Sequence, residues 1–174
     1  TSARVIERDV EGRKTPYLNV SLKDEDGRYY ISIALAQSGA QMLARKMGNA
    51  EPGVETEIMM FATYGQKEGA MRAYANHGAT VRQHGKEVVS LDPKGSLVPQ
   101  VNAATKALKD AGVDDKETIG KRRQAVALQF HLGLMSEVEK KFSDFYATRE
   151  IPANGHEAGT DEVPFADESD DIPF

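Results

Sequence analysis

The last 25 residues of the chain differ so strongly in charge from the rest that they cannot share its folded core. Residues 150–174 contain eight acidic side chains and neither lysine nor arginine. The whole chain has 22 basic and 27 acidic residues, so residues 1–149 carry 22 bases against 19 acids, a net charge of +3, and residues 150–174 carry −8. A segment with little apolar surface and much like charge cannot offset the entropy that ordering costs. We therefore expect a folded domain over 1–149 and a disordered acidic tail over 150–174.

The size and composition of the first 149 residues suit a single cytoplasmic domain. This length is enough for one hydrophobic core. The chain has no cysteine, which excludes disulfides and thiolate metal sites and is compatible with a reducing compartment. Residues 1–14 are charged and lack the apolar stretch of a signal peptide, and no run is long enough to span a membrane. We expect a soluble, cytoplasmic protein.

The first half of this domain has the alternating pattern of β-strands. Apolar side chains recur at every second position over residues 18–22 and again over residues 28–35, which is the period of a half-buried strand. The residues between them, Asp24-Glu25-Asp26-Gly27, are typical of a turn. These segments predict a β-hairpin.

A short helix and a second pair of strands are predicted next. Leu43 and Met47 at helical spacing, followed by Gly48, indicate a helix over residues 38–47. Residues 54–64 are rich in β-branched and aromatic side chains, and Val81 and residues 87–91 flank a predicted turn at 83–85. Several strands around one short helix fit a mainly β, α+β domain built on an OB-fold barrel of about five strands, followed by C-terminal helices.

Two segments fit either a helix or a strand. Residues 66–77 are rich in alanine and end at Asn76-His77-Gly78, which favours a helix. Residues 124–134 alternate like a strand, but a longer apolar stripe at helical spacing favours a helix there too: Leu128, Leu132, Met135, Val138, Phe142 and Phe145. A capping box from Ser136 to Glu139 would instead start a separate helix. A further helix is predicted over residues 99–111, with Val101, Ala104 and Leu108 on one face, and these helices can pack on the barrel or mediate self-association.

The acidic tail ends in a motif that suits a partner protein better than a folded core. Asp170-Asp171-Ile172-Pro173-Phe174 places a phenylalanine and its carboxylate behind two aspartates. A partner with an apolar pocket rimmed by lysine or arginine can bind the ring and make charge-assisted hydrogen bonds to the carboxylates. This ending resembles the C-terminal tip of bacterial and bacteriophage single-stranded-DNA-binding proteins, whose acidic tails recruit replication, recombination and repair enzymes.

The resemblance implies that the chain binds and protects single-stranded DNA with little sequence specificity, in a bacterial or phage-infected cell. Replication, recombination and repair proteins would be its partners, with no membrane involved. The chain has no tryptophan, on which the bacterial members typically stack bases, and this departure indicates a divergent or phage-encoded member. Two alternatives stay open: an adaptor that uses the tip without binding DNA, and a single-strand annealing recombination protein.

The expected DNA contact is a set of aromatic and basic side chains on the first hairpin. A single strand offers phosphates and unstacked bases, so its binding surface combines basic groups with exposed rings. By strand parity, Tyr17 and Lys23 share a face opposite the apolar residues of the first strand, as Arg28 and Tyr30 do on the second. The alternative is that the tyrosines merely edge the core with solvated hydroxyls. Three further candidates lie later in the chain: Tyr64, Arg72 and Tyr74, of which the last two require a strand at their segment.

Motifs for catalysis and metal binding are missing from the sequence. The four histidines are scattered and lack carboxylate partners at metal-ligand spacing. Residues 65–69 resemble a glycine-rich loop but lack the Gly-Lys-Ser/Thr ending of a phosphate loop. We therefore expect no enzymatic activity and no cofactor.

A near-repeat inside the tail generates the first prediction. Residues 161–165, Asp-Glu-Val-Pro-Phe, have the layout of the last five residues but no carboxylate of their own beside the ring. A pocket that binds the carboxylate of Phe174 would lose a charge-assisted hydrogen bond, worth about 1.5–3 kcal/mol, on binding the internal copy. Deleting Phe174 should nearly abolish pull-down of a tail-binding helicase or exonuclease, whereas Phe165→Ala should leave most of it. Equal losses would show that the partner reads only the acidic and aromatic pattern.

Overall fold

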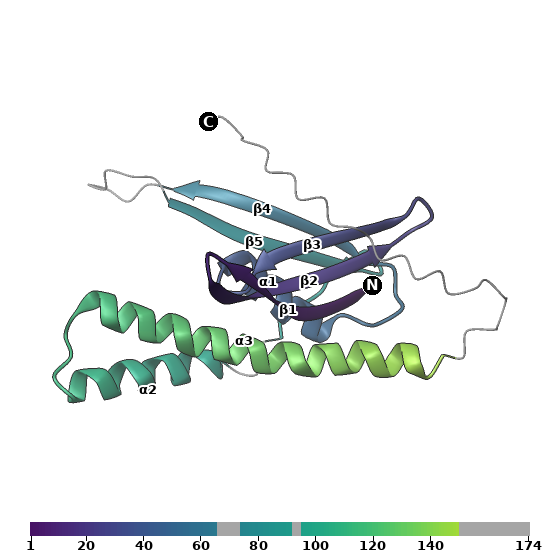
Figure 1. Cartoon of the computed structure of the whole chain (residues 1–174). Helices are drawn as coiled ribbons and strands as arrows, with labels where there is room; N and C mark the ends of the chain where they lie inside the picture. The colour runs from purple at the N-terminus through teal and green to yellow at the C-terminus, as the bar shows by residue number, and fades with distance from the viewer. Residues whose placement is uncertain (66–73, 92–94, 150–174) are drawn as a thin grey trace.

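Two antiparallel sheets and three helices make up the part of the chain that the computed structural model describes, residues 1–65, 74–91 and 95–149 (Figure 1). In chain order the elements are β1 Ser2–Val10, β2 Arg13–Lys23, β3 Arg28–Ala34, α1 Ser38–Asn49, β4 Glu57–Gly65, β5 Tyr74–Gln83, β6 Lys86–Glu87, α2 Leu97–Asp110 and α3 Lys116–Ala147. The sheets have the strand orders β1–β2–β3 and β4–β5–β6. The predicted mixture of strands and helices is confirmed, but within these ranges no strand pairing joins the two sheets into a closed barrel.

The first sheet contains the hairpin that the sequence predicts. Residues 17–23 of β2 pair with residues 28–34 of β3 in antiparallel register. Asp24 closes the turn, because its Oδ1 accepts hydrogen bonds of 2.9 Å from the backbone N–H groups of Asp26 and Gly27. Leu18 and Val20 are fully buried on the face that points to the helices. The alternation in the sequence therefore reflects a sheet with one face in the core and the other toward solvent.

β1 is a strand that the sequence did not reveal. It pairs with β2 along its whole length through a two-residue turn at Glu11 and Gly12, whose φ angles of 53° and 75° suit a tight hairpin. β3 pairs only with residues 17–23, so residues 7–10 and 13–16 project beyond it as a two-stranded ribbon. Most of this ribbon is exposed on both faces. Its side chains therefore show no apolar alternation, and the pattern from which strands are recognised is lost.

α1 packs between the second sheet and α3. α1 contacts β5 and α3, and apart from Lys46 its buried residues are small or apolar: Gly39, Ala40, Leu43, Ala44 and Met47. The predicted helix is confirmed, but Gly48 does not end it. A Cβ atom at Gly48 would lie 2.8 Å from Cδ2 of Leu91, so the glycine permits close packing inside the helix.

The helix favoured for residues 66–77 is wrong where the structure describes that segment. Residues 74–77 belong to β5, which pairs with β4 over residues 57–65, and residues 66–73 lie outside the described ranges. Gly78, interpreted as a helix stop, lies opposite Phe61 in this ladder. A Cβ atom at Gly78 would lie 2.5 Å from Cζ of the Phe61 ring. The glycine is therefore a strand residue whose missing side chain makes room for a ring from the neighbouring strand.

The second predicted hairpin is confirmed in a shorter form. β5 turns into β6 at His84 and Gly85, whose φ angles are 52° and 71°. β6 covers only residues 86–87, but the N–H of Val88 still donates to the carbonyl of Val81 at 2.8 Å. Glu87 forms an ion pair with the buried Lys46 of α1. The pKa of Glu87 is lowered because its carboxylate accepts a hydrogen bond from Lys46 and lies beside the positive charge of that side chain.

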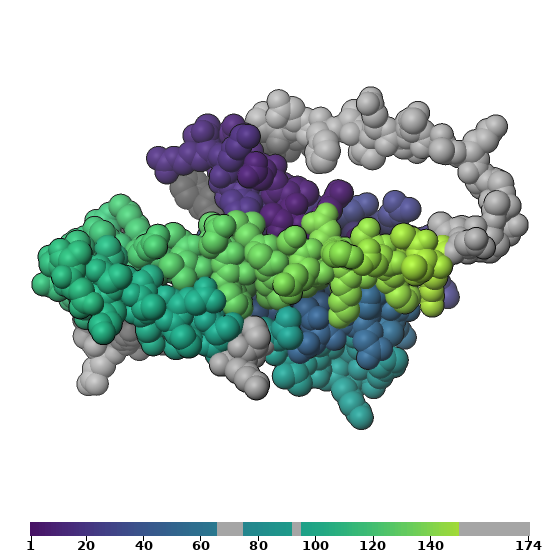
Figure 2. Space-filling view, turned by 90° about the horizontal axis from the view of Figure 1, so that it is seen from below, coloured from purple at the N-terminus to yellow at the C-terminus, as the bar shows by residue number. Residues whose placement is uncertain are grey.

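α3 is one continuous helix of 32 residues that runs along the face of the molecule below both sheets (Figures 1 and 2). The strand alternative for residues 124–134 and a separate start at Ser136 are both wrong. The helix begins after Asp115, whose side chain accepts a 2.7 Å hydrogen bond from the N–H of Thr118. Hydrogen bonding from the side chain of Thr118, and then from its backbone, lowers the pKa of Asp115. Its buried residues form one stripe: His131, Leu134, Met135, Val138 and Phe142. α2 packs against the first half of α3 and half-buries the predicted residues Val101, Ala104 and Leu108.

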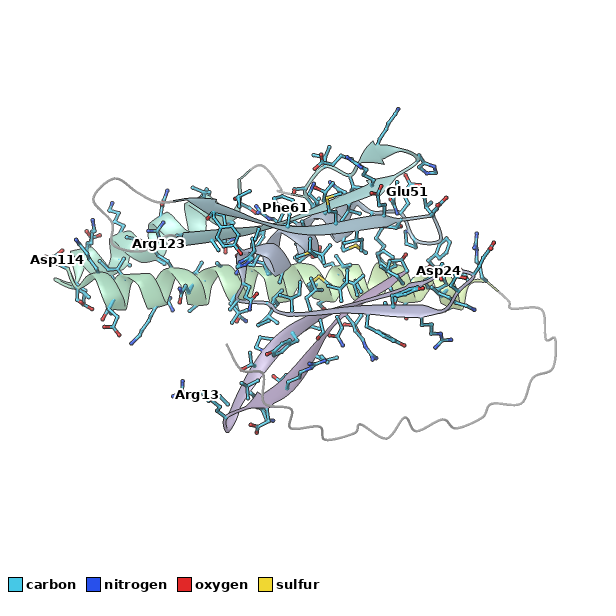
Figure 3. The ribbon with its side chains drawn as sticks, turned by 90° about the horizontal axis from the view of Figure 1, so that it is seen from above. Arg13, Asp24, Glu51, Phe61, Asp114 and Arg123 are labelled. Carbon is cyan, nitrogen blue, oxygen red and sulfur yellow. The ribbon has the colours of Figure 1, made fainter. Side chains whose placement is uncertain are left out.

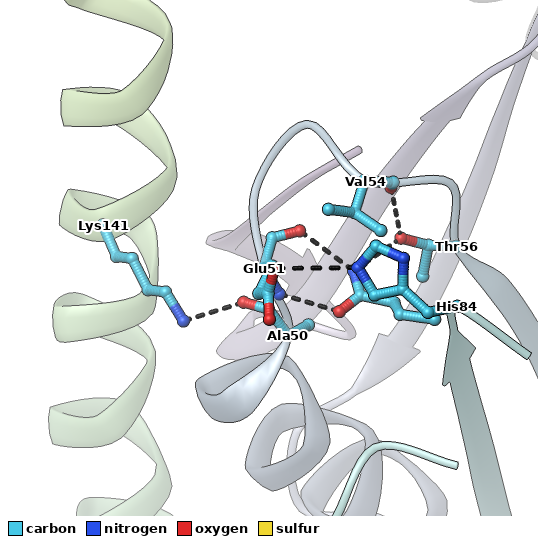
Figure 4. A network of polar contacts seen from close by, with 7 residues as sticks. Ala50, Glu51, Val54, Thr56, His84 and Lys141 are labelled. Atoms are coloured by element: carbon cyan, nitrogen blue, oxygen red, sulfur yellow. Dashed lines mark hydrogen bonds and ion pairs between the residues drawn. The ribbon is translucent and has the colours of Figure 1, made fainter. Parts of the chain in front are cut away.

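A polar network fixes the loop between α1 and β4 (Figure 4). The buried Gln83 donates from Nε2 to the carbonyl of Glu51 and to Oγ1 of Thr56, both at 2.9 Å, and accepts from the N–H of Glu51 at 2.8 Å. Lys141 of α3 donates to the carbonyl of Ala50 at 2.7 Å. The ammonium group of Lys141 therefore satisfies carbonyls at the end of α1.

Burial of His131 makes the stability of the fold depend on pH. His131 is 1% exposed, and its Nδ1 lies 2.6 Å from the carbonyl of Ala127. Burial, and then the nearby charge of Arg45, lowers the pKa of His131 below its ordinary value of 6.5. The unfolded chain therefore takes up this proton at a higher pH than the folded protein does, so protonation favours unfolding.

The free energy of unfolding should fall as pH drops below about 6.5, by up to about 1.4 kcal/mol per pH unit, until the folded-state pKa is reached. Urea unfolding of the full chain between pH 7.5 and 5.5 measures this. His131→Met should remove that part of the pH dependence, and His77→Gln, at an exposed histidine, should keep it. Equal slopes for the chain and for both variants would contradict the prediction.

Candidate nucleic-acid interface

One face of the first sheet points away from the helices and carries basic and aromatic side chains from all three strands. The other face is the buried one, with Ala3, Leu18 and Val20 at 0–2% exposure. Because side chains alternate along a strand and residues in register share a face, the pairing of β1, β2 and β3 sets the members of the exposed face. We call these the outer face: Arg4, Arg8, Tyr17, Lys23, Arg28 and Tyr30.

The two rings of the outer face differ in how they are held. Tyr30 is 65% exposed, so its ring is open to solvent. Tyr17 is half-buried, and the guanidinium carbon of Arg8 lies 4.9 Å from the centroid of its ring, a cation–π distance. Between them, Ser32 donates a hydrogen bond from Oγ to Oδ1 of Asn19 at 2.5 Å and ties β3 to β2. The surface is therefore a hydrogen-bonded sheet with one ring free and one ring already stacked against a cation.

The cations of the outer face are available to an anionic ligand. Arg4, Arg8, Lys23 and Arg28 are exposed, and none of them forms an ion pair within the described ranges. The β2–β3 turn bounds the face at one end with three acids at residues 24–26. At the other end the β1–β2 ribbon continues to Arg13 at its tip (Figure 3). On the outer face, positive charge thus runs from Lys23 and Arg28, beside the acidic turn, past Arg4 and Arg8 toward the tip of the ribbon.

The outer face gathers four of the predicted DNA-binding residues and leaves the others elsewhere. Tyr17, Lys23, Arg28 and Tyr30 lie together, as strand parity predicted. Two of the remaining candidates lie on the second sheet: Tyr64, 79% exposed, is near the end of β4, and Tyr74 begins β5. Arg72 and the acidic tail with its tip Asp170–Phe174 lie outside the described ranges.

Arg4 and Arg8 are members of the outer face that sequence reasoning missed. Both lie on β1, which was not recognised as a strand. The alternation of Ala3 and Val5 with Arg4 and Ile6 was the available signal, but it is too short to stand out beside the charged ribbon.

Other kinds of site find little support in the described residues. No group of three or more histidine, cysteine, aspartate or glutamate side chains is placed there to hold a metal ion. None of the helices in these ranges has both the length and the apolar character to cross a membrane. A surface depression of about 960 Å³ lies between the β2–β3 turn and the α1–β4 loop, and its lining includes five acids: Asp24, Glu25, Asp26, Glu55 and Glu57. Such a depression disfavours an anionic ligand.

Comparison with known proteins returned no match to a protein-family model, to a curated protein or to a solved structure. The function is therefore inferred from the residues of the outer face and of the acidic tail.

Two adjacent tyrosines offer a matched test of base stacking. Tyr30 points to the outer face, whereas Tyr29 lies opposite Leu22 on the other face and is 49% exposed. If Tyr30 stacks on a base, Tyr30→Ala should weaken binding of an oligo(dT) strand by about 1–3 kcal/mol. Tyr29→Ala removes the same side chain one position away and should change affinity little. Fluorescence anisotropy of labelled oligo(dT) measures both, and equal losses would remove Tyr30 from the site.

Proposed function

We propose that the chain binds single-stranded DNA with little sequence preference on the outer face of the β1–β2–β3 sheet. The observation that carries this proposal is that two tyrosine rings lie among four cations on one solvated sheet face, and that these cations form no ion pair with the described residues. Rings stack on any base and cations contact any phosphate, so such a surface recognises a single strand without reading its sequence. No catalytic step is needed for this role.

The arrangement of elements supports an opened, OB-like relative of the expected barrel. The order of three strands, one helix and two strands is that of a five-stranded OB fold, to which β6, α2 and α3 are added. OB folds bind oligonucleotides on the face of their second and third strands, beside the loops that follow the first and the fourth strand. The outer face draws Tyr17 and Lys23 from β2, and Arg28 and Tyr30 from β3. The tip of the β1–β2 ribbon and the paired ends of β4 and β5 also point toward the same end of the molecule (Figure 1).

The acidic tail supplies the second half of the proposal. Its last residues, Asp170–Phe174, present an aromatic ring, an isoleucine and a proline beside two aspartates. We propose that this segment recruits replication, recombination or repair proteins that offer a basic, apolar pocket, as the resemblance to the tips of single-stranded-DNA-binding proteins suggests. The tail carries −8 and residues 1–149 carry +3. An attached polyanion competes with DNA for the same cations at a high effective concentration.

Two claims can be tested together: that the cations of the outer face bind DNA, and that the acidic tail competes for them. Labelled oligo(dT) is titrated with the full chain and with a variant that ends at residue 149. Affinity should fall as salt rises, because binding releases counterions from the phosphates. The truncated variant should bind more tightly than the full chain at low salt, and the difference should shrink at high salt, where screening weakens the competition.

The two outcomes of this titration separate the alternatives. Absence of binding by either protein at low salt would contradict the proposed function and leave the adaptor that uses only the tip. Tight binding with no gain on truncation would keep the DNA-binding function and contradict the competition by the tail. The affinities for oligo(dA), oligo(dC) and oligo(dT) strands of equal length are compared as the control for sequence preference.

A further inference from the structure

β4 is an edge strand that lacks the usual protection against pairing with another strand. Its only neighbour in the described part of the chain is β5, and no backbone hydrogen bond there outside the β4–β5 ladder involves residues 57–65. Natural edge strands are commonly protected by charged side chains, prolines or bulges. Residues 58–65, Ile-Met-Met-Phe-Ala-Thr-Tyr-Gly, contain no charge and no proline, and their register with β5 is unbroken.

The exposed face of β4 is apolar as well. Met59 and Phe61 are 47% and 42% exposed on the same face of the strand. The ring of Phe61 lies over Gly78 of β5, where no side chain competes for its place. Phe61, labelled in Figure 3, is therefore held on the exposed face of the sheet with its ring leaning toward β5. An open edge and an exposed apolar pair on one strand are together the properties of a surface that adds a further strand.

We propose that β4 pairs antiparallel with β4 of a second copy of this chain, across a two-fold axis at Phe61. In this register Glu57 lies opposite Gly65, Met59 lies opposite Thr63, and Phe61 lies opposite its counterpart in the second copy. The Met59 and Phe61 side chains of both copies then form one apolar row. The β4–β5–β6 sheets of the two copies become one sheet of six strands. Such a two-fold interface is self-complementary, because each strand presents the same groups to the other.

The charge pattern of β4 permits a second copy of the same strand as the occupant. Glu57 is the only charged residue of β4; it lies at the end of the strand and pairs with Arg82 at 3.6 Å. The proposed register sets it opposite a glycine, so no like charges face one another. Another long edge strand, β1, carries charged side chains at residues 4 and 7–9, which are a common protection of an edge against strand addition. This proposal does not depend on DNA binding, since it uses the other sheet.

Sedimentation equilibrium of the full chain tests the proposal directly. The chain should sediment as a dimer at micromolar concentration. Met59→Lys places a charge on the exposed face of the edge strand and should raise the dimer dissociation constant at least tenfold. Val89→Lys adds the same charge at a position that is 76% exposed and outside both sheets, so it should leave the constant unchanged. Matching circular dichroism melts would show that both variants are folded. A monomeric full chain, or equal effects of the two variants, would overturn the proposal.

Cysteine crosslinking tests the register, because the natural chain has no cysteine. Phe61→Cys lies on the two-fold axis, opposite its own copy, and should oxidise to a covalent dimer at protein concentrations well above the dissociation constant. Asn76→Cys lies on the same face but on β5, more than three strand spacings of about 4.8 Å from its counterpart, and should stay monomeric under the same conditions. Equally fast crosslinking of both variants would indicate random collision and contradict the pairing.

Discussion

Packing of α3 against β1 and α1 is the interaction on which the rest of the structure depends. The buried stripe of α3 contributes Met135, Val138 and Phe142 to the same apolar core that receives Leu18 and Val20 from the first sheet. α1 brings the second sheet to this core through its small residues. Because the two sheets do not pair with each other within the described ranges, the helices are what hold them in one molecule.

This packing decides which surfaces are left to solvent. One face of the first sheet is buried in the core, so the cations and rings at alternate positions must face outward. On the second sheet, the core takes Val81 and Ala79 of β5, which leaves Met59 and Phe61 of β4 exposed. The two sheets therefore present surfaces of different chemistry, one basic and aromatic, the other apolar at Met59 and Phe61 with the Glu57–Arg82 ion pair at its end. We assign DNA to the first and a second copy of the chain to the second.

The sequence predicted those parts of the fold in which each strand or helix has one buried face. The β2–β3 hairpin and α1 belong to this group, because residues 18–22, 28–35 and 38–47 alternate between core and solvent with the period of their structure. β1 could not be predicted, since its second half projects beyond β3 and has no buried face. The first residues of β5 were mistaken for a helix because Gly78 serves a cross-strand contact with Phe61, and such a contact is invisible before the pairing of the strands is known. For the same reason the outer face was predicted without Arg4 and Arg8, whose strand was missing.

Ultraviolet crosslinking of the full chain to oligo(dT), followed by mass spectrometry of the crosslinked peptides, tests the central claim most directly. The outer face of the β1–β2–β3 sheet should contain the contacts, with crosslinked bases at Tyr17 and Tyr30 and peptides confined to residues 4–32. Crosslinks restricted to the second sheet or to the α2–α3 hairpin, under saturating oligonucleotide, would contradict the assignment of DNA to this face.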